Sequence, residues 1–163
     1  MNELSFQEQL TRILNAQVQL SGDLLALLKQ EYEILSTARL ENLENVVEQK
    51  KPIMVDLEDL GQAWELLLKN RGVALSAEGI GRFLNEFDEV NGTQLLAAWT
   101  SLLEKASECL QKNTINGSVI AMRNQTTQHL LALLRGQKPE DRLYNHLGGE
   151  SNLSAGGKSL AKA

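Results

Sequence analysis

The chain has 163 residues, a net charge of -5, one cysteine and two prolines, which suits one domain of ordinary size with a tail. Aromatic residues make up only 4% of it, and this scarcity together with many Leu, Ala, Glu, Gln and Lys residues is typical of helical bundles rather than sheets. The acidic balance argues against nucleic acid as a partner, and no apolar run approaches the ~20 residues that a membrane span needs.

The first residues, MNELSFQEQL, lack the basic and apolar regions of a secretory signal. We therefore expect a cytoplasmic protein that does not insert directly into a membrane. Cys109 has no second cysteine with which to form an internal disulfide. Because no His or cationic cluster adjoins it, we expect Cys109 to be a small buried hydrophobe rather than a reactive thiol.

Two long helices are predicted in the first half of the chain. Apolar residues spaced by threes and fours predict a helix over residues 5–38, and its two adjacent apolar stripes indicate contacts with at least two other helices. A second helix follows a short link at 36–42 and ends at 70–72, so the two should form an antiparallel hairpin. Pro52 predicts either a kink in the second helix or a helix that begins again there.

A short helix is predicted next, with Ser76 at its start and Asn91-Gly92 at its end, and Thr93 is placed to cap the following helix. That last helix is predicted over residues 93–135. It passes through Asn116-Gly117, a dipeptide that is common in turns, because the alternation of threes and fours does not slip there.

The stripe that carries this alternation is expected to face the bundle. It contains Trp99, Leu103, Ala106, Leu110, Asn113, Gly117, Ile120, Asn124, Thr127, Leu131 and Leu134. Gly117 is expected to let another backbone approach closely. The rest of this helix surface is polar but almost uncharged, which fits either a solvated face or a surface that accepts a partner without desolvating charges.

The character of the sequence changes after Gly136. The region has two Gly-Gly pairs and no sustained period, which predicts a flexible tail, yet hydrophobic residues punctuate it as in segments that fold on binding. It is either a partner-binding segment or a terminus without a role. We therefore predict an all-α protein. Residues 1–136 form an elongated antiparallel helical bundle, or coiled coil, of three long helices and one short one, and residues 137–163 form a flexible tail that carries a partner-binding segment.

The sequence offers little material for catalysis. Its two histidines, His129 and His146, lack the neighbouring carboxylates or the rigid frame that a metal or catalytic site needs, and no phosphate-binding loop, dinucleotide fingerprint or zinc spacing is present. We expect no enzyme activity, no cofactor and no bound metal.

Two stretches carry a family pattern. In residues 27–51, LLKQEYEILSTARLENLENVVEQKK, a Leu-rich helix carries Glu31 and the returning helix carries Leu43 and Lys50. The second stretch is an Asn-x-x-Asn-Gly helix followed by a Tyr-x-x-x-Gly element, made of Asn113, Asn116, Gly117 and Ile120 and then of Tyr144 to Gly148. In this order, over most of the chain, these features resemble the FlgN family of flagellar export chaperones.

The resemblance implies a cytoplasmic chaperone that binds the C-terminal helical segments of hook-associated proteins, the junction proteins between hook and filament. It would prevent their premature assembly and deliver them to the flagellar type III export apparatus, which includes an export gate and an ATPase complex. The resemblance assigns Tyr144 to docking at the export gate. It assigns cargo binding to Leu130, Leu131, Leu133, Leu134, Leu143 and Leu147.

Two alternatives stay open at this point. The long stripes could belong to a structural or scaffolding coiled-coil homo-oligomer, or the chain could be a type III chaperone for a different client. The sequence also leaves open whether the protein is a monomer or a dimer before it binds cargo, and whether the tail folds back on the bundle.

Overall fold

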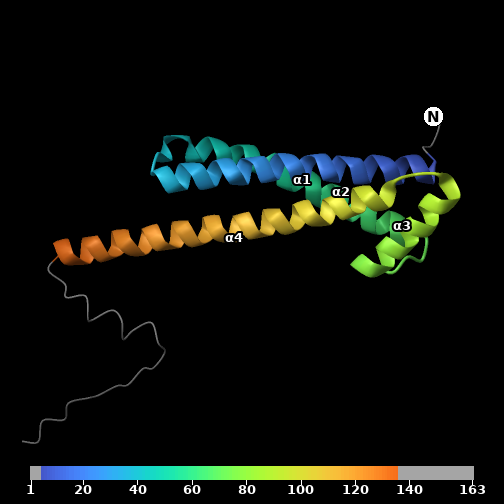
Figure 1. Cartoon of the computed structure of the whole chain (residues 1–163). Helices are drawn as coiled ribbons and strands as arrows, with labels where there is room; N and C mark the ends of the chain where they lie inside the picture. Colours follow the sequence, from blue (N-terminus) through green and yellow to red (C-terminus); the bar gives the residue numbers. More distant parts are fainter. Residues whose placement is uncertain (1–4, 136–163) are drawn as a thin grey trace, which may run out of the picture. The chain divides into compact units, whose positions relative to one another are not determined.

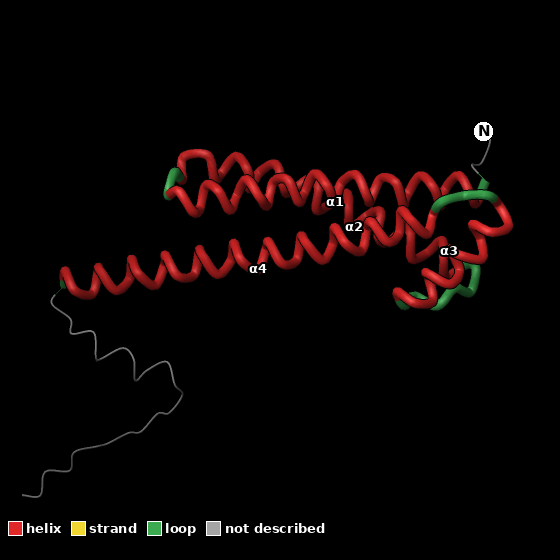
Figure 2. Tube along the Cα trace, viewed as in Figure 1, coloured by secondary structure: helices red, strands yellow, loops and turns green. Residues whose placement is uncertain are grey.

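The computed structural model describes residues 5–135, which form helices and loops and no strand (Figure 2). The elements are α1 (Phe6–Thr37), the 3-10 turn η1 (Leu40–Asn42), α2 (Leu43–Lys69), α3 (Ala77–Asn91) and α4 (Leu95–Leu134). The chain divides into two units, Met1–Ala121 and Met122–Ala163, and residues 122–135 of the second unit continue α4. The predicted all-α bundle of three long helices and one short one is confirmed. The predicted tail, 137–163, lies outside the described residues.

A capping box fixes the start of α1. The Glu8 N–H donates to Ser5 Oγ at 3.3 Å, and the Ser5 N–H donates to Glu8 Oε2 at 2.7 Å. These reciprocal bonds satisfy two of the N–H groups that a helix start leaves unpaired. The bond from the Ser5 backbone, reinforced by the Ser5 hydroxyl, lowers the pKa of the Glu8 carboxyl.

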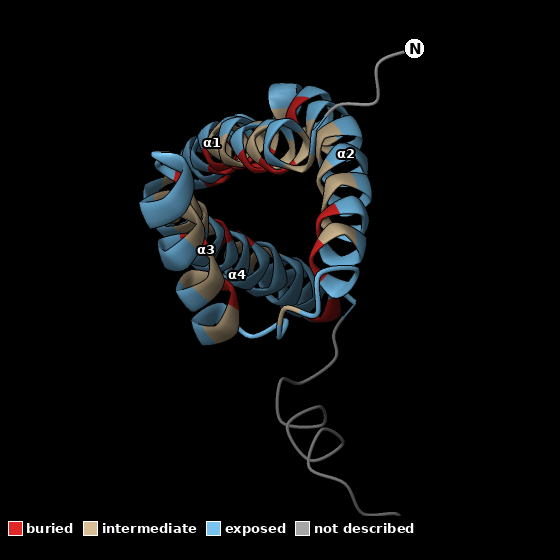
Figure 3. Ribbon diagram, turned by 90° about the vertical axis from the view of Figure 1, so that its right-hand side faces the viewer, coloured by how far each residue is buried: buried red, intermediate tan, exposed pale blue. Residues whose placement is uncertain are grey.

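The first two long helices lie side by side as a hairpin, as Figures 1 and 3 show for α1 and α2. The buried residues of α1 form one stripe along its length: Leu10, Leu14, Gln17, Ser21, Leu25, Leu28, Glu31 and Leu35. On α2, Val46 is buried before Pro52, and Trp64 and Leu68 are buried after it. Because both flanks are anchored in this way, α2 runs unbroken through Pro52, and the expectation of a new helix beginning there is wrong.

The main hydrophobic core lies where α3 meets the hairpin and the start of α4. Its buried side chains come from four helices: Leu10, Leu14, Trp64, Leu68, Ile80, Leu84 and Leu95. The Phe6 ring packs edge-on against Phe87 at 5.9 Å between centroids. The predicted start of α3 is confirmed, since Ser76 Oγ accepts the N–H of Gly79 at 3.0 Å. A side chain at Gly79 would collide with the Ala74 carbonyl oxygen, so the tight entry to α3 requires glycine there.

The start of α4 is capped by a residue of the preceding helix. The Asp88 carboxylate accepts the backbone N–H groups of Leu95 at 2.9 Å and Leu96 at 2.8 Å. Thr93, which the sequence suggested as the cap, instead donates its hydroxyl to Asp88. The expectation that Thr93 caps α4 is therefore wrong, because the Asp88 carboxylate on α3 supplies the acceptor oxygens for both N–H groups. Burial alone would raise the pKa of Asp88, but the bonds from Thr93, Leu96 and Leu95 outweigh it and lower the pKa.

Helix α4 runs parallel to α1 in the first unit. Ser21 contacts Cys109 and Leu28 contacts Asn116, so residue numbers increase in the same direction along the two helices. Its buried positions up to Ala121 are Leu95, Cys109 and Asn116. The stripe expected to face the bundle lies beside this face and is largely exposed, with Leu110 at 70%. The predicted helix is correct, but the predicted inward stripe is displaced by one residue.

Candidate partner-binding site

The candidate site lies on α4, a 40-residue helix that stays regular through Asn116-Gly117. Several of its hydroxyl groups form hydrogen bonds within the helix itself. The hydroxyls of Thr114, Ser118 and Thr126 each donate to the carbonyl oxygen four residues earlier, at 2.8–3.0 Å. These three hydroxyls on the uncharged polar surface of α4 therefore already have hydrogen-bond partners.

The end of α4, in the second unit, presents a group of exposed leucines. Leu131 is 45% exposed and Leu134 is 84% exposed, and Leu130 and Leu133 fall between these values. They lie within five residues, little more than one turn of helix, with i,i+3 and i,i+4 neighbours among them, so they form one apolar surface rather than scattered residues. These are four of the six predicted cargo-binding residues. The other two, Leu143 and Leu147, and the predicted docking residue Tyr144 lie outside the described residues.

Asn116, from the resemblance-based motif, is a contact residue in the first unit. Its side chain is only 2% exposed, and its Nδ2 donates to the Leu28 carbonyl oxygen at 3.0 Å and to Glu31 Oε2 at 2.8 Å. Among residues 5–135, its Oδ1 has no hydrogen-bond partner. Asn116 thereby joins α4 to α1 inside the bundle.

The same carboxylate holds α2. Lys50 Nζ donates to Glu31 Oε1 at 2.7 Å, and both side chains are largely buried, at 13% and 5% exposure. We call Asn116, Glu31 and Lys50 the polar clasp. A charge removed from water at such a site is tolerated because a partner charge and a hydrogen-bond donor compensate it. The clasp connects all three long helices through one carboxylate.

The other motif residues lie on the outer side of α4. Asn113, Gly117 and Ile120 are exposed, and a Cβ added at Gly117 would meet nothing within 4 Å. The expectation that Gly117 admits a close backbone is therefore wrong. The family pattern in the sequence includes Glu31, Lys50 and Asn116 individually, but it does not predict that they contact one another. The available signal was Glu31 itself, an acidic residue within the inward stripe of α1 between Leu28 and Leu35.

Cys109 lies seven residues, about two helical turns, before Asn116 and is buried beside Leu25 and Leu28. The sequence-based prediction that Cys109 is buried is confirmed. Its Sγ donates to the Ser21 carbonyl oxygen at 3.5 Å. Burial, reinforced by the Glu108 carboxylate, raises the pKa of the Cys109 thiol. The closed bundle thus disfavours the reactive thiolate.

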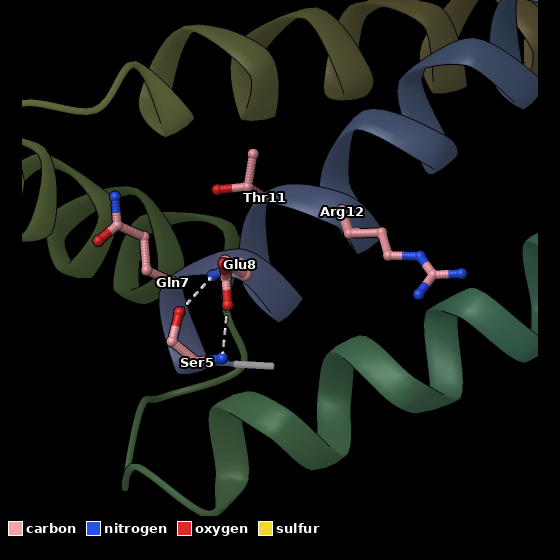
Figure 4. A pocket seen from close by; sticks show the side chains of 5 residues that line it. All are labelled: Ser5, Gln7, Glu8, Thr11 and Arg12. Carbon is pink, nitrogen blue, oxygen red and sulfur yellow. Dashed lines mark hydrogen bonds between the residues drawn. The ribbon is translucent and has the colours of Figure 1, made fainter. Parts of the chain in front are cut away.

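A hollow at the start of α1 and the distribution of possible metal ligands complete the description of residues 5–135. The hollow is lined by Ser5, Gln7, Glu8, Thr11 and Arg12, and Figure 4 shows that Ser5 and Glu8 are engaged with each other in the capping box. Among residues 5–135, no three His, Cys, Asp or Glu side chains gather closely enough to hold a metal ion. In the same range, no helix combines the length and the apolar character that crossing a bilayer requires.

Comparison with known proteins agrees with the helical architecture. The model of the FlgN family, described as FlgN protein, matches residues 1–152. A crystal structure of a flagella synthesis protein FlgN from Pseudomonas aeruginosa is similar to the chain with a TM-score of 0.62 and 29% sequence identity. The match covers 82% of this chain and 99% of that one. No curated protein matches. Since the family model spans most of its length, the chain belongs to the FlgN family, and its role is that of a chaperone in flagellum biogenesis.

Proposed function

We propose that the protein binds hook-associated proteins through the end of α4 and the segment that follows it, prevents their premature assembly and delivers them to the flagellar type III export apparatus. The observation that supports this most directly is the exposed apolar surface of Leu130, Leu131, Leu133 and Leu134. Four exposed leucines grouped within little more than one helical turn suit an amphipathic helix of a partner, which buries its own apolar face against them.

The residues after Gly136 extend this surface in our proposal. Leu143 and Leu147 would add apolar anchors for the client, and Tyr144 would contact the export gate. A binding mechanism of this kind needs no nucleotide or metal, because burial of apolar surface supplies the free energy. Domain 1–136 would supply the folded support for a partner-binding tail at 137–163.

A capture experiment tests the proposal. Intact protein and a variant ending at Gly136 are used to capture partners from a lysate of flagellated cells, and hook-associated proteins are identified by mass spectrometry. We expect the intact protein to retain them and the shortened one, with unchanged helical circular dichroism, to lose them. Equal retention by both would contradict a role for the tail. Retention of other flagellar proteins only would favour a chaperone for a different client.

A second measurement separates the proposal from a scaffolding coiled coil. Sedimentation velocity of the isolated protein over a hundredfold concentration range reports its oligomeric state. A stable oligomer at all concentrations that binds no hook-associated protein would favour the scaffold. Stoichiometric association with the client is the result that the proposal predicts.

A further inference from the structure

The amount of buried apolar surface between α4 and the α1–α2 hairpin differs along the first unit. At the α3 end, seven buried apolar side chains from four helices form the main core. Farther along, the second apolar cluster contains, among residues 5–135, only Leu25, Leu28 and Cys109, with Leu24 packed beside it. Because apolar burial supplies most of the free energy of helix packing, this part of α4 is held by much less of it.

Beyond Cys109, the contacts between α4 and α1 are mainly polar. Beyond Cys109 the inward positions of α4 are Lys112, Asn116 and Val119, of which Asn116 alone is buried. Lys112 Nζ lies over the Tyr32 ring at 5.3 Å from its centroid. Cys109 and Asn116 donate to main-chain carbonyls inside α1. A carbonyl oxygen has two lone pairs, so a carbonyl within α1 can accept a hydrogen bond from α4 in addition to the one that it accepts within its own helix. When α4 detaches, the carbonyl keeps its intrahelical bond.

We propose that the polar clasp is a reversible latch from which residues 103–121 of α4 detach locally, while the core at the α3 end stays folded. Three features favour local opening here. The Asn116 Oδ1, which has no hydrogen-bond partner among residues 5–135, gains water on opening. The charges of Glu31 and Lys50 recover hydration, which offsets part of the lost contact. The apolar cluster that opening disrupts is the small second one, not the main core.

The latch also makes closure specific. Asn116 reaches both Leu28 and Glu31 only when α4 lies in one register against α1. A register slip would leave a buried carboxylate without its amide donor, which is costly in an apolar surrounding. The open form would present Leu24, Leu25 and Leu28 of α1, so the latch controls whether that apolar surface is accessible.

Cys109 is a built-in probe of this opening because it is the single cysteine of the chain and is buried between α1 and α4. The rate of its modification by N-ethylmaleimide is measured in full-length protein at several urea concentrations below the unfolding transition. The logarithm of the modification rate is plotted against urea concentration, and so is the logarithm of the equilibrium constant of global unfolding. If opening is local, the first plot should have less than half the slope of the second. A slope equal to that of global unfolding would overturn the proposal.

A variant and a matched control test the role of the clasp. Asn116→Ala removes two hydrogen bonds to α1 and should raise the modification rate on the order of tenfold. Thr114→Ala, on the exposed side of the same turn, loses a bond internal to α4 and should leave the rate within about twofold. Equal rates in the two variants would overturn the assignment of the latch to the clasp. Should Asn116→Ala fail to fold, the urea dependence of the unsubstituted protein still decides whether opening is local.

Discussion

Replacement of Lys50 by methionine, which matches the aliphatic stem of lysine but lacks its ammonium group, should lower the free energy of unfolding of the bundle strongly. The aliphatic stem is preserved, but Glu31, whose side chain is 5% exposed, loses the one ion pair that it makes among residues 5–135. Breaking a buried pair from one side typically costs about 3–5 kcal/mol, since a charge is left uncompensated. Asn116 still donates to Oε2 and Lys50 is not fully buried, so we expect the lower end of this range, about 3 kcal/mol.

Urea unfolding followed by helical circular dichroism measures this change. With a slope of about 1–3 kcal/mol per molar urea, a loss of 3 kcal/mol lowers the midpoint by at least about 1 M. The control is Lys69→Met, which removes an exposed ion pair with Glu65 at 3.4 Å and should cost at most about 1 kcal/mol.

The double variant Glu31→Met/Lys50→Met sharpens the test. Apolar residues of similar volume often replace a buried ion pair at no cost, so most of the stability lost in Lys50→Met should return. In this variant Asn116 keeps its bond to the Leu28 carbonyl. If Lys50→Met cost no more than Lys69→Met, the clasp would not be a buried, coupled ion pair, and the reasoning would be refuted.

Three further changes have defined outcomes in the same unfolding assay. Gly117→Ala should raise the free energy of unfolding by up to about 1 kcal/mol, because the added methyl meets open space in a regular helix; a loss would show a close contact there. Leu84→Ala, in the main core, should cost about 2–5 kcal/mol, and a cost below 1 kcal/mol would contradict its full burial. Asp88→Ala should cost about 1 kcal/mol at pH 7 through loss of the α4 cap. Because the pKa of Asp88 is lowered by folding, its stabilisation is complete above the ordinary Asp value and is lost as pH falls through the lowered one; the difference between Asp88→Ala and the unsubstituted protein should therefore shrink at low pH, and a constant difference would contradict a charged cap.

Local sequence signals predicted the helices well because their causes are local. Ser76 marks the start of α3 through a bond to an N–H three residues away, and Gly92 adopts the left-handed conformation that ends it. Periodicity likewise carried α4 correctly through Asn116-Gly117, since a helix tolerates one glycine at a cost of about 1 kcal/mol.

The packing of α4 could not be predicted in the same way. Counting apolar residues favoured the stripe with Leu103, Leu110 and Ile120, whereas the buried face uses Cys109 and Asn116. A buried asparagine is stable only if distant residues supply its partners, and those partners lie on α1, 85 and 88 residues away in sequence. Periodicity within one helix holds no information about such a partner.

The sequence did not predict the residue that caps α4, because that residue also lies on another helix. Thr93 stands at a suitable position just before the helix, but Asp88 reaches its first N–H groups from seven and eight residues earlier, across the turn between α3 and α4. The candidate site was predicted in part from the Leu-rich end of α4, whose leucines are exposed. The roles assigned to Leu143, Tyr144 and Leu147 stay predictions.

The central claim is that the exposed leucines at the end of α4 bind the client. Isothermal titration calorimetry with the C-terminal helical segment of a hook-associated protein tests it on full-length protein carrying Leu131→Ser and Leu134→Ser. Leu66→Ser on α2, at 61% exposure, is the matched control. We predict that the double substitution weakens binding by at least about tenfold, as expected when central apolar contacts are removed, and that Leu66→Ser leaves the affinity unchanged. Equal affinity in all three proteins would contradict the claim.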